Sequence, residues 1–401
     1  MHAIAHQYIE RSSGRLETER LYQDRLVLFF YGRVRESMPA VFRMLTSRRS
    51  TQLLGYLNYD TGWGSGACRR FLRDQQVCLG ECLDDPSGFT SARQAFERKI
   101  RYWEYRPMPE DARAVASPCD ARVLVGSFRE HASLFVKDKF FNYEELLGRG
   151  RQNWLAAFAN GDYAIFRLTP EKYHYNHTPV TGQVLDHYTV EGDYHSCNPG
   201  AAVLLATPYS KNRRVVTVVD TDVEGGTQVG KVAMIEVVAL MIGDIVQCYS
   251  ESQYDDPQPV VPGMFLRAGQ PKSLFRPGSS TTVLIFEKDR VRFAADLLAN
   301  QATPMAHSRY SLAFGQPLIE TDVRVRSPIA HAVSGGRVTR SYVVIHDHLD
   351  PPAMDNGSVG NAGTVARPTA PLPLAGAGTE ERRVVSSNSA KPSSVEKKDV
   401  E

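Results

Sequence analysis

The chain has 401 residues, of which 42% are hydrophobic and 23% charged, an ordinary globular composition that excludes whole-chain disorder and an integral membrane protein. Its 47 Lys and Arg against 45 Asp and Glu leave a formal charge of +2, too balanced for nucleic acid to be the main partner. Six scattered cysteines without a C-x-x-C pair indicate neither a disulfide framework nor a zinc knuckle. The first residues lack the features of a signal peptide, and no stretch reaches the roughly 18 apolar residues of a spanning helix. A cytoplasmic protein is expected, and the sequence leaves the oligomeric state open, a homodimer included.

The N-terminal part of the chain is expected to be helical. Apolar residues recur at helical spacing from residue 16 to residue 110, interrupted by Pro39 and the glycine-rich stretch 61–66. Residues 1–60 hold nine Arg, no Lys and six Asp or Glu, an excess of three positive charges. Aromatic residues stand among these arginines: Phe29, Phe30, Tyr31 and Phe42 among Arg25, Arg33, Arg35, Arg43, Arg48 and Arg49. We predict a helical region over residues 1–110 that lies on an anionic membrane surface. The alternative is a helical cap packed on the next domain with a solvated arginine face.

The sequence changes character at residue 111. Short β-rich runs follow one another between Gly, Pro, Asn and Asp, with a helix expected at 143–148; the runs are ARVLVGSF, ASLFV, YAIFRL, QVLDHYTV, RRVVTVVDTDV, KVAMIEVVALMI and TTVLIFE. This pattern predicts an α+β chain in which the helical region precedes a compact, mainly antiparallel β sandwich or barrel-like domain over residues 111–332. Residues 333–401 form a C-terminal extension whose composition predicts disorder from residue 351.

Three short segments could carry chemistry. Asp120 follows a Ser-Pro-Cys turn, His174 and His177 stand three residues apart, and Gly278-Ser279 precede the run TTVLIFE. Taken singly, each has an ordinary structural interpretation as a turn or as a core histidine. No metal site is predicted, because no matching Cys or carboxylate pair stands near the histidines. A serine hydrolase is disfavoured, because the chain has no G-x-S-x-G elbow.

Together and in this order, the three segments resemble a known family. ASPCDARV, YHYNHTPVTG and FRPGSSTTVLIFE are similar to the signature segments of the phosphatidylserine decarboxylases, pyruvoyl-dependent enzymes that cut themselves. The stretches VKDKFFNY, NRR and GKVAMIEVVALMIGDI are also similar, so the resemblance covers roughly residues 100–300. The chain departs from the family pattern at Ser280, where Thr is common, and at Pro271 and Ser273, where relatives often carry Glu and Gly.

The resemblance implies a proenzyme that cleaves itself between Gly278 and Ser279 and converts Ser279 into a covalent pyruvoyl cofactor. In this scheme His177, oriented by Asp120, takes the proton of Ser279 Oγ. His174 assists decarboxylation or reprotonation, which needs a proton donor. The implied reaction converts phosphatidylserine to phosphatidylethanolamine through a Schiff base on the pyruvoyl ketone, in a protein held peripherally at the membrane.

Two other functions remain open from the sequence. A pyruvoyl-dependent decarboxylase could instead act on a soluble amino acid, because fold and cofactor do not fix the substrate. Lipid binding by the N-terminal region would distinguish a lipid substrate from a soluble amino acid. The third hypothesis is a binding module with a lipoyl-like β fold and an inert site, and such a chain would stay uncut.

Overall fold

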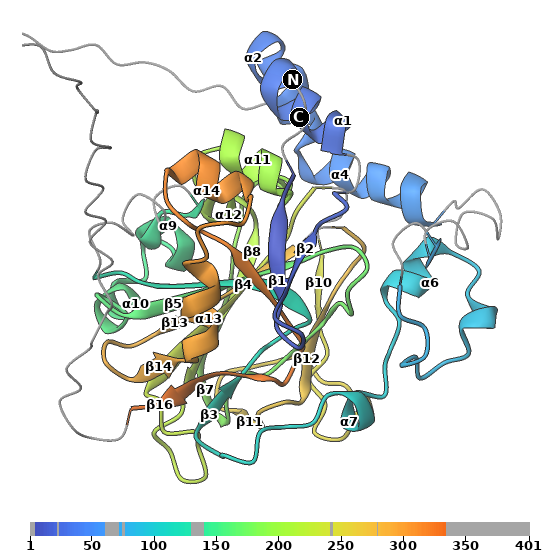
Figure 1. Cartoon of the computed structure of the whole chain (residues 1–401). Helices are drawn as coiled ribbons and strands as arrows, with labels where there is room; N and C mark the ends of the chain where they lie inside the picture. Colours follow the sequence, from blue (N-terminus) through green and yellow to red (C-terminus); the bar gives the residue numbers. More distant parts are fainter. Residues whose placement is uncertain are drawn as a thin grey trace, which may run out of the picture. The chain divides into compact units, whose positions relative to one another are not determined.

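A ten-stranded β-sheet forms the centre of the protein (Figure 1). The computed structural model describes residues 5–21, 24–60, 72–73, 77–129, 140–240, 244–278 and 280–333. The strands of this sheet are β1 (Gln7–Glu10), β2 (Arg15–Thr18), β4 (Ala121–Ser127), β5 (Asp162–Leu168), β7 (Gly182–Val190), β8 (Arg214–Asp220), β9 (Lys231–Val237), β11 (Phe265–Leu266), β13 (Ser280–Phe286) and β15 (Glu320–Val323). Their order is β11-β7-β8-β9-β13-β5-β4-β15-β1-β2. Every neighbouring pair is antiparallel except β1 and β15.

Two smaller sheets and a set of short helices complete the described fold. One three-stranded sheet has the order β10 (Ile245–Gln247), β12 (Pro271–Phe275), β6 (Tyr175–His177), and the other β14 (Val291–Phe293), β16 (Pro328–Ala332), β3 (Ala114–Ala116). The helices after residue 85 are η3 (Pro86–Gly88), α6 (Ala92–Phe96), α7 (Tyr102–Tyr105), α9 (Tyr143–Leu147), α10 (Gln152–Ala157), α11 (Pro199–Leu204), α12 (Pro208–Lys211), α13 (Ala295–Gln301) and α14 (Arg309–Phe314). The α+β class is therefore confirmed, with open sheets rather than a closed barrel in the described part of the chain.

The central strands are apolar on both faces, because both faces of the sheet are covered. In β13 the side chains of Val283 and Ile285 join a core with the helices α9 and α10, whereas Leu284 and Phe286 join a second core with the smaller sheets. Side chains alternate along a strand, so a continuous apolar run is what a doubly covered strand requires. Most of the predicted runs became strands for this reason, and the helix expected at 143–148 is α9.

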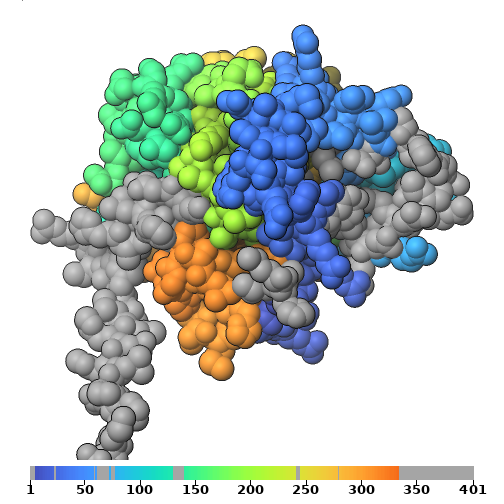
Figure 2. All heavy atoms as spheres, turned by 90° about the horizontal axis from the view of Figure 1, so that it is seen from above, coloured from blue at the N-terminus to red at the C-terminus, as the bar shows by residue number. Residues whose placement is uncertain are grey.

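The N-terminal helices pack on α11 through part of their apolar surface. They are α1 (Asp24–Phe29), η1 (Phe30–Val34), α2 (Arg35–Ser37), α3 (Pro39–Leu45), α4 (Arg48–Gly55) and η2 (Tyr56–Asp60). Tyr31 and Phe42 are buried with Ala201 and Leu205. Figure 2 shows these helices, in blue, as an outer layer against the green residues around 200. The expectation that Tyr31 and Phe42 face a membrane is therefore wrong, because these rings are used to attach the helices.

The first twenty residues differ from the helical region expected there. β1 and β2 form a hairpin, and β1 extends the large sheet by pairing with β15. Ile9 is the buried contact of this hairpin, against Ala306 and Ile319. The strands QYIE and RLET are four residues each and largely polar, so their sequences give too little periodicity to identify them.

The described residues all belong to one compact unit, which spans Met1–Thr339. Residues 340–401 lie outside the described residues. The division predicted at residue 110 and the disorder predicted from residue 351 stay predictions. The predicted run ASLFV at 132–136 also lies outside the described residues. In the described part of the chain, none of the helices combines the length and the apolar character needed to cross a bilayer.

Candidate active site

Asp120 lies in a buried position at the start of β4. Both of its oxygens are bound by the Arg106 guanidinium, at 3.1 Å and 2.8 Å, and the backbone N–H of Val325 donates to Oδ1 at 2.8 Å. Burial by itself raises the pKa of Asp120, but the charge and hydrogen bonds of Arg106 outweigh it and lower this pKa below its ordinary value. Asp120 is therefore a fixed negative charge.

His177 ends strand β6 and is fully buried. Its backbone N–H donates to Pro118 O at 2.7 Å, which ties it to the segment that carries Asp120. Its Nδ1 lies 2.8 Å from Gly269 O, and its Nε2 lies 2.9 Å from the Tyr173 hydroxyl. Because a carbonyl only accepts, Nδ1 carries the proton and Nε2 accepts from Tyr173. Burial lowers the pKa of His177 to about 3, so the ring is neutral at pH 7.

The acceptor that orients His177 here is the Gly269 carbonyl, whereas the sequence suggested the Asp120 carboxylate for this role. Both Asp120 oxygens are occupied by Arg106. Gly269 has φ +77, and a side chain there would bring a Cβ within 2.2 Å of Met108 Sδ. Glycine is thus required where the chain turns to present this carbonyl.

His174 lies beside the same strand in a different environment. Its Nδ1 lies 2.8 Å from Lys172 O, and its ring stacks on Phe96 with the centroids 3.6 Å apart. Among the described residues its Nε2 has no hydrogen-bond partner, although the side chain is fully buried. Burial lowers the pKa of His174 well below its ordinary value. The ring therefore offers an unpaired nitrogen lone pair in a dry environment.

The Gly278-Ser279 bond stands at the beginning of β13. Gly278 has φ +148, a conformation that residues with a side chain rarely adopt. Ser279 lies outside the described residues, so no contact of its side chain is described. Its successor Ser280 opens β13, and all seven residues of this strand are buried. The bond is thus next to one of the most central strands of the sheet.

Two cavities adjoin these residues. A cavity of about 70 Å³ at Gly278 is lined in part by the apolar residues Leu21, Val27, Tyr59 and Leu240. A larger, mainly polar cavity of about 790 Å³ reaches Asp120 and Tyr173, and part of its wall is the N-terminal hairpin. Both cavities therefore border the N-terminal segments, and neither is lined by His174 or His177.

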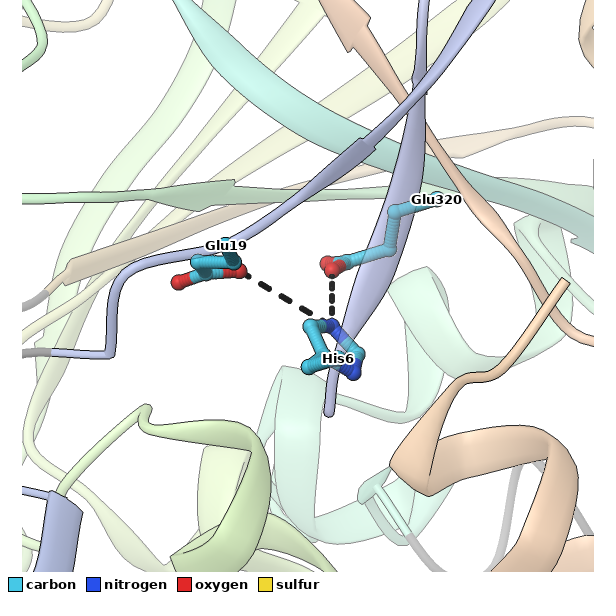
Figure 3. A group of neighbouring side chains, drawn as sticks. All are labelled: His6, Glu19 and Glu320. Carbon is cyan, nitrogen blue, oxygen red and sulfur yellow. Dashed lines mark hydrogen bonds and ion pairs between the residues drawn. The ribbon is translucent and has the colours of Figure 1, made fainter. Parts of the chain in front are cut away.

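Glu19 and Glu320 meet His6 under the N-terminal hairpin and form a group that could resemble a metal site (Figure 3). His6 Nε2 lies 2.8 Å from Glu320 and 3.9 Å from Glu19. Arg167 already pairs with both carboxylates, and Arg122 pairs with Glu19. Because two guanidinium groups already neutralise these carboxylates, we interpret the cluster as an anchor that fastens the hairpin to β5 and β15.

Sequence reasoning missed three residues that hold this site: Arg106, Tyr173 and Gly269. Tyr173 is adjacent to His174 in a motif already identified, but which side chain reaches His177 depends on the fold. Gly269 stands in the turn RAGQP, and a glycine two residues before a proline does indicate a turn. Arg106 carries no local signal, because its partner is 14 residues away in the chain.

Comparison with known proteins agrees with the three sequence segments. A family model described as phosphatidylserine decarboxylase matches residues 92–319. A phosphatidylserine decarboxylase proenzyme of Chlamydia trachomatis serovar L2 is 29% identical over 310 residues, covering 74% of this chain and 91% of the relative. That of Chlamydia muridarum is 32% identical over 235 residues, covering 58% and 72%. Proenzyme 2 of Oryza sativa subsp. japonica is 31% identical over 231 residues, covering 57% and 34%. The resemblance found in the sequence is confirmed: the chain belongs to the phosphatidylserine decarboxylase family.

Proposed function

We propose that this chain is a proenzyme that cleaves itself between Gly278 and Ser279 and then decarboxylates phosphatidylserine to phosphatidylethanolamine. The observation that carries the proposal is the state of His177, a buried neutral imidazole whose Nε2 lone pair accepts from the Tyr173 hydroxyl and must exchange this partner for Ser279. A neutral imidazole in a fixed tautomer is what a general base needs. The names of the relatives favour phosphatidylserine over a soluble amino acid.

In the proposed cleavage, Ser279 Oγ attacks the carbonyl carbon of Gly278 and its proton passes to His177. The Gly278–Ser279 amide is exchanged for an ester. Elimination then releases the Gly278 carboxylate, and addition of water with loss of ammonia leaves a pyruvoyl group at residue 279. This group supplies an electron sink for decarboxylation. The positive φ of Gly278 supports the assignment, because the backbone before the bond is held in a conformation suited to glycine alone.

Asp120 has an electrostatic role in this scheme. Burial and the positive charges of Arg326 and Arg106 lower the pKa of His177, whereas the Gly269 carbonyl and the negative charge of Asp120 act in the opposite direction. Asp120 therefore stabilises the imidazolium that exists while His177 holds the proton. Arg106 keeps the carboxylate ionised and in place.

His174 serves the catalytic cycle after cleavage. Its Nε2 is buried and has no partner in the described structure, and its Nδ1 is fixed by Lys172 O. An unpaired nitrogen of this kind can take the proton that the substrate ammonium group must lose and deliver it to the carbon that loses CO₂. The stacked Phe96 ring excludes water from one face of the imidazole.

The N-terminal helices are proposed to deliver the enzyme to an anionic membrane. They expose large apolar side chains on their outer surface: Leu26, Phe29, Met38, Val41, Met44, Leu53, Tyr56 and Leu57. The exposed arginines Arg25, Arg33, Arg43, Arg48 and Arg49 stand among them. This combination suits a bilayer interface. The same region supplies Leu21, Val27 and Tyr59 to the cavity at Gly278, so an apolar lining extends toward the scissile bond.

The experiment compares CO₂ release from phosphatidylserine vesicles and from free serine by the purified full chain. We expect release from the vesicles, little from free serine, and none from Ser279→Ala. Release from free serine alone would replace the lipid by a soluble substrate. Equal release by Ser279→Ala would contradict the pyruvoyl assignment.

A further inference from the structure

A fully buried polar network crosses between two sheets directly beside the proposed cleavage site. Its members are Asn176 on β6, Glu236 on β9, Lys272 and Ser273 on β12, and Thr282 on β13, and each is at most 1% exposed. Thr282 Oγ1 donates to Asn176 Oδ1 at 2.8 Å. Asn176 Nδ2 lies 3.2 Å from Ser273 Oγ and 3.3 Å from Glu236 Oε1. Lys272 Nζ pairs with Glu236 Oε2 at 2.7 Å, and Ser273 donates to the other oxygen of Glu236.

The chemistry of the network fixes the orientation of the Asn176 amide. A carboxylate only accepts, so the NH₂ group of Asn176 must face Glu236, and its carbonyl oxygen must face Thr282. The only proton of the Thr282 hydroxyl is then used for Asn176. Thr282 therefore binds the residue that directly precedes His177.

The strand that carries His177 and strand β13 are not paired with each other among the described strands. His177 belongs to the sheet β10-β12-β6, whereas β13 pairs with β5 and β9 in the ten-stranded sheet. Before cleavage, residues 276–279 connect β12 to β13 covalently. The side chains of this network are a second link between the two sheets, in addition to that covalent connection.

We propose that Asn176, held by Glu236 and bound to Thr282, is a positioning residue. It fixes the start of β13 relative to β6, the strand that carries His177. The inference rests on the proposed self-cleavage. Sequence position supports it, because Asn176 directly precedes His177 and Thr282 follows Ser279 by three residues. Loss of the contact leaves buried polar atoms without a partner and shifts the base relative to the serine, and displacements of this kind slow reactions strongly.

The test measures the rate of self-cleavage by pulse-chase in a cell-free translation reaction. Thr282→Val removes the donor without changing the shape of the side chain, and we expect cleavage about tenfold slower. Thr321→Val is the matched control, since Thr321 is equally buried in the same sheet and its hydroxyl has no partner among the described residues. It should change the rate less than about twofold. Equal rates for the two variants would overturn the proposal.

A charge exchange separates positioning from general stability. Asn176→Asp sets a second carboxylate against Glu236 and should slow cleavage about a hundredfold. Adding Glu236→Gln exchanges the two groups, so that the carboxylate is at position 176 and the amide at position 236. The double variant should cleave at least about tenfold faster than Asn176→Asp alone. Absence of recovery in a double variant whose unfolding midpoint matches that of the wild type, both measured in the Ser279→Ala background, would contradict the assignment. If the wild-type chain itself is not cut at Gly278–Ser279, the proposed function fails instead.

Discussion

The strand β13 and the N-terminal helices differ in how far their apolar side chains are buried. Every residue of β13 is buried. In the N-terminal helices, Phe42 of α3 is buried, whereas Leu26 of α1, Met44 of α3 and Leu53 of α4 are exposed. The side chains around β13 are buried, and burial lowers the pKa of His174 and of His177, which keeps both rings neutral. The exposed apolar side chains of the helices do not contribute to a core of this kind. The difference fits the two tasks proposed above, with chemistry in the sheet interior and attachment to the lipid through the helices.

The largest effect is expected at His177. His177→Ala should slow self-cleavage about a thousandfold, because a positioned general base typically contributes between a hundredfold and ten-thousandfold. Gel analysis of freshly synthesised chain measures the rate. His187→Ala is the control, since His187 lies on β7 of the ten-stranded sheet, away from β6, and its pKa is also lowered by burial, to about 4. Cleavage of both variants at the wild-type rate would remove His177 from the chemistry.

His174→Ala should separate decarboxylation from self-cleavage. Both product chains should form at a near-normal rate, while kcat for decarboxylation falls about a hundredfold, because the role proposed for the unpaired Nε2 comes after cleavage. Steady-state CO₂ release from phosphatidylserine vesicles gives kcat. Unchanged kcat would return His174 to a structural role against Phe96.

The outer surface of the helices should show the opposite pattern. Leu53→Glu with Leu57→Glu should leave cleavage unchanged and lower vesicle sedimentation and activity on vesicles about tenfold, because apolar contact with the interface is lost. The control is Leu312→Glu on α14, a leucine that is 59% exposed, against 58% and 53% for Leu53 and Leu57. Equal losses in control and test variants would contradict a membrane surface at these helices.

The charges of the same surface predict a salt effect. Reversal of Arg33, Arg43 and Arg48 to Glu should weaken sedimentation with phosphatidylserine vesicles, and high salt should weaken it in the wild type. Activity on a short-chain soluble analogue should stay within about twofold of wild type. Arg35 is left unchanged, because it donates to Leu204 O and helps to attach the helices. Vesicle binding that ignores both salt and charge reversal would exclude an electrostatic attachment.

The smallest change is expected in the pH dependence of cleavage. With a pKa of about 3, His177 stays neutral from pH 7.5 to 5.5, so the rate should vary less than about twofold. A histidine of ordinary pKa near 6.5 would lose about tenfold over that range, and such a loss would contradict the buried state. Stability follows the same linkage: unfolded His177 gains a proton below about pH 6.5 and folded His177 only near 3. The free energy of unfolding should therefore decrease as the pH falls through this window.

Much of the interior could be predicted from sequence, because doubly covered strands need continuous apolar runs such as TTVLIFE. The segments around Asp120, His174 and His177 were also identifiable as motifs. The hydrogen-bond partners Gly269 and Arg106 were not, because their contacts depend on how distant segments meet. For the same reason Tyr31 and Phe42 were misplaced on the surface: helical periodicity indicates an apolar side but not which side faces the protein.

The measurement closest to the central claim is the intact mass of the purified wild-type chain and of Ser279→Ala. The account predicts two wild-type chains, residues 1–278 and residues 279–401, from the 401-residue precursor. The second chain should be lighter than a serine-started chain by one NH₃, as a pyruvoyl terminus requires. Ser279→Ala should give a single full-length mass. An uncut wild-type chain, or a Ser279→Ala chain cut at this bond, would contradict the account.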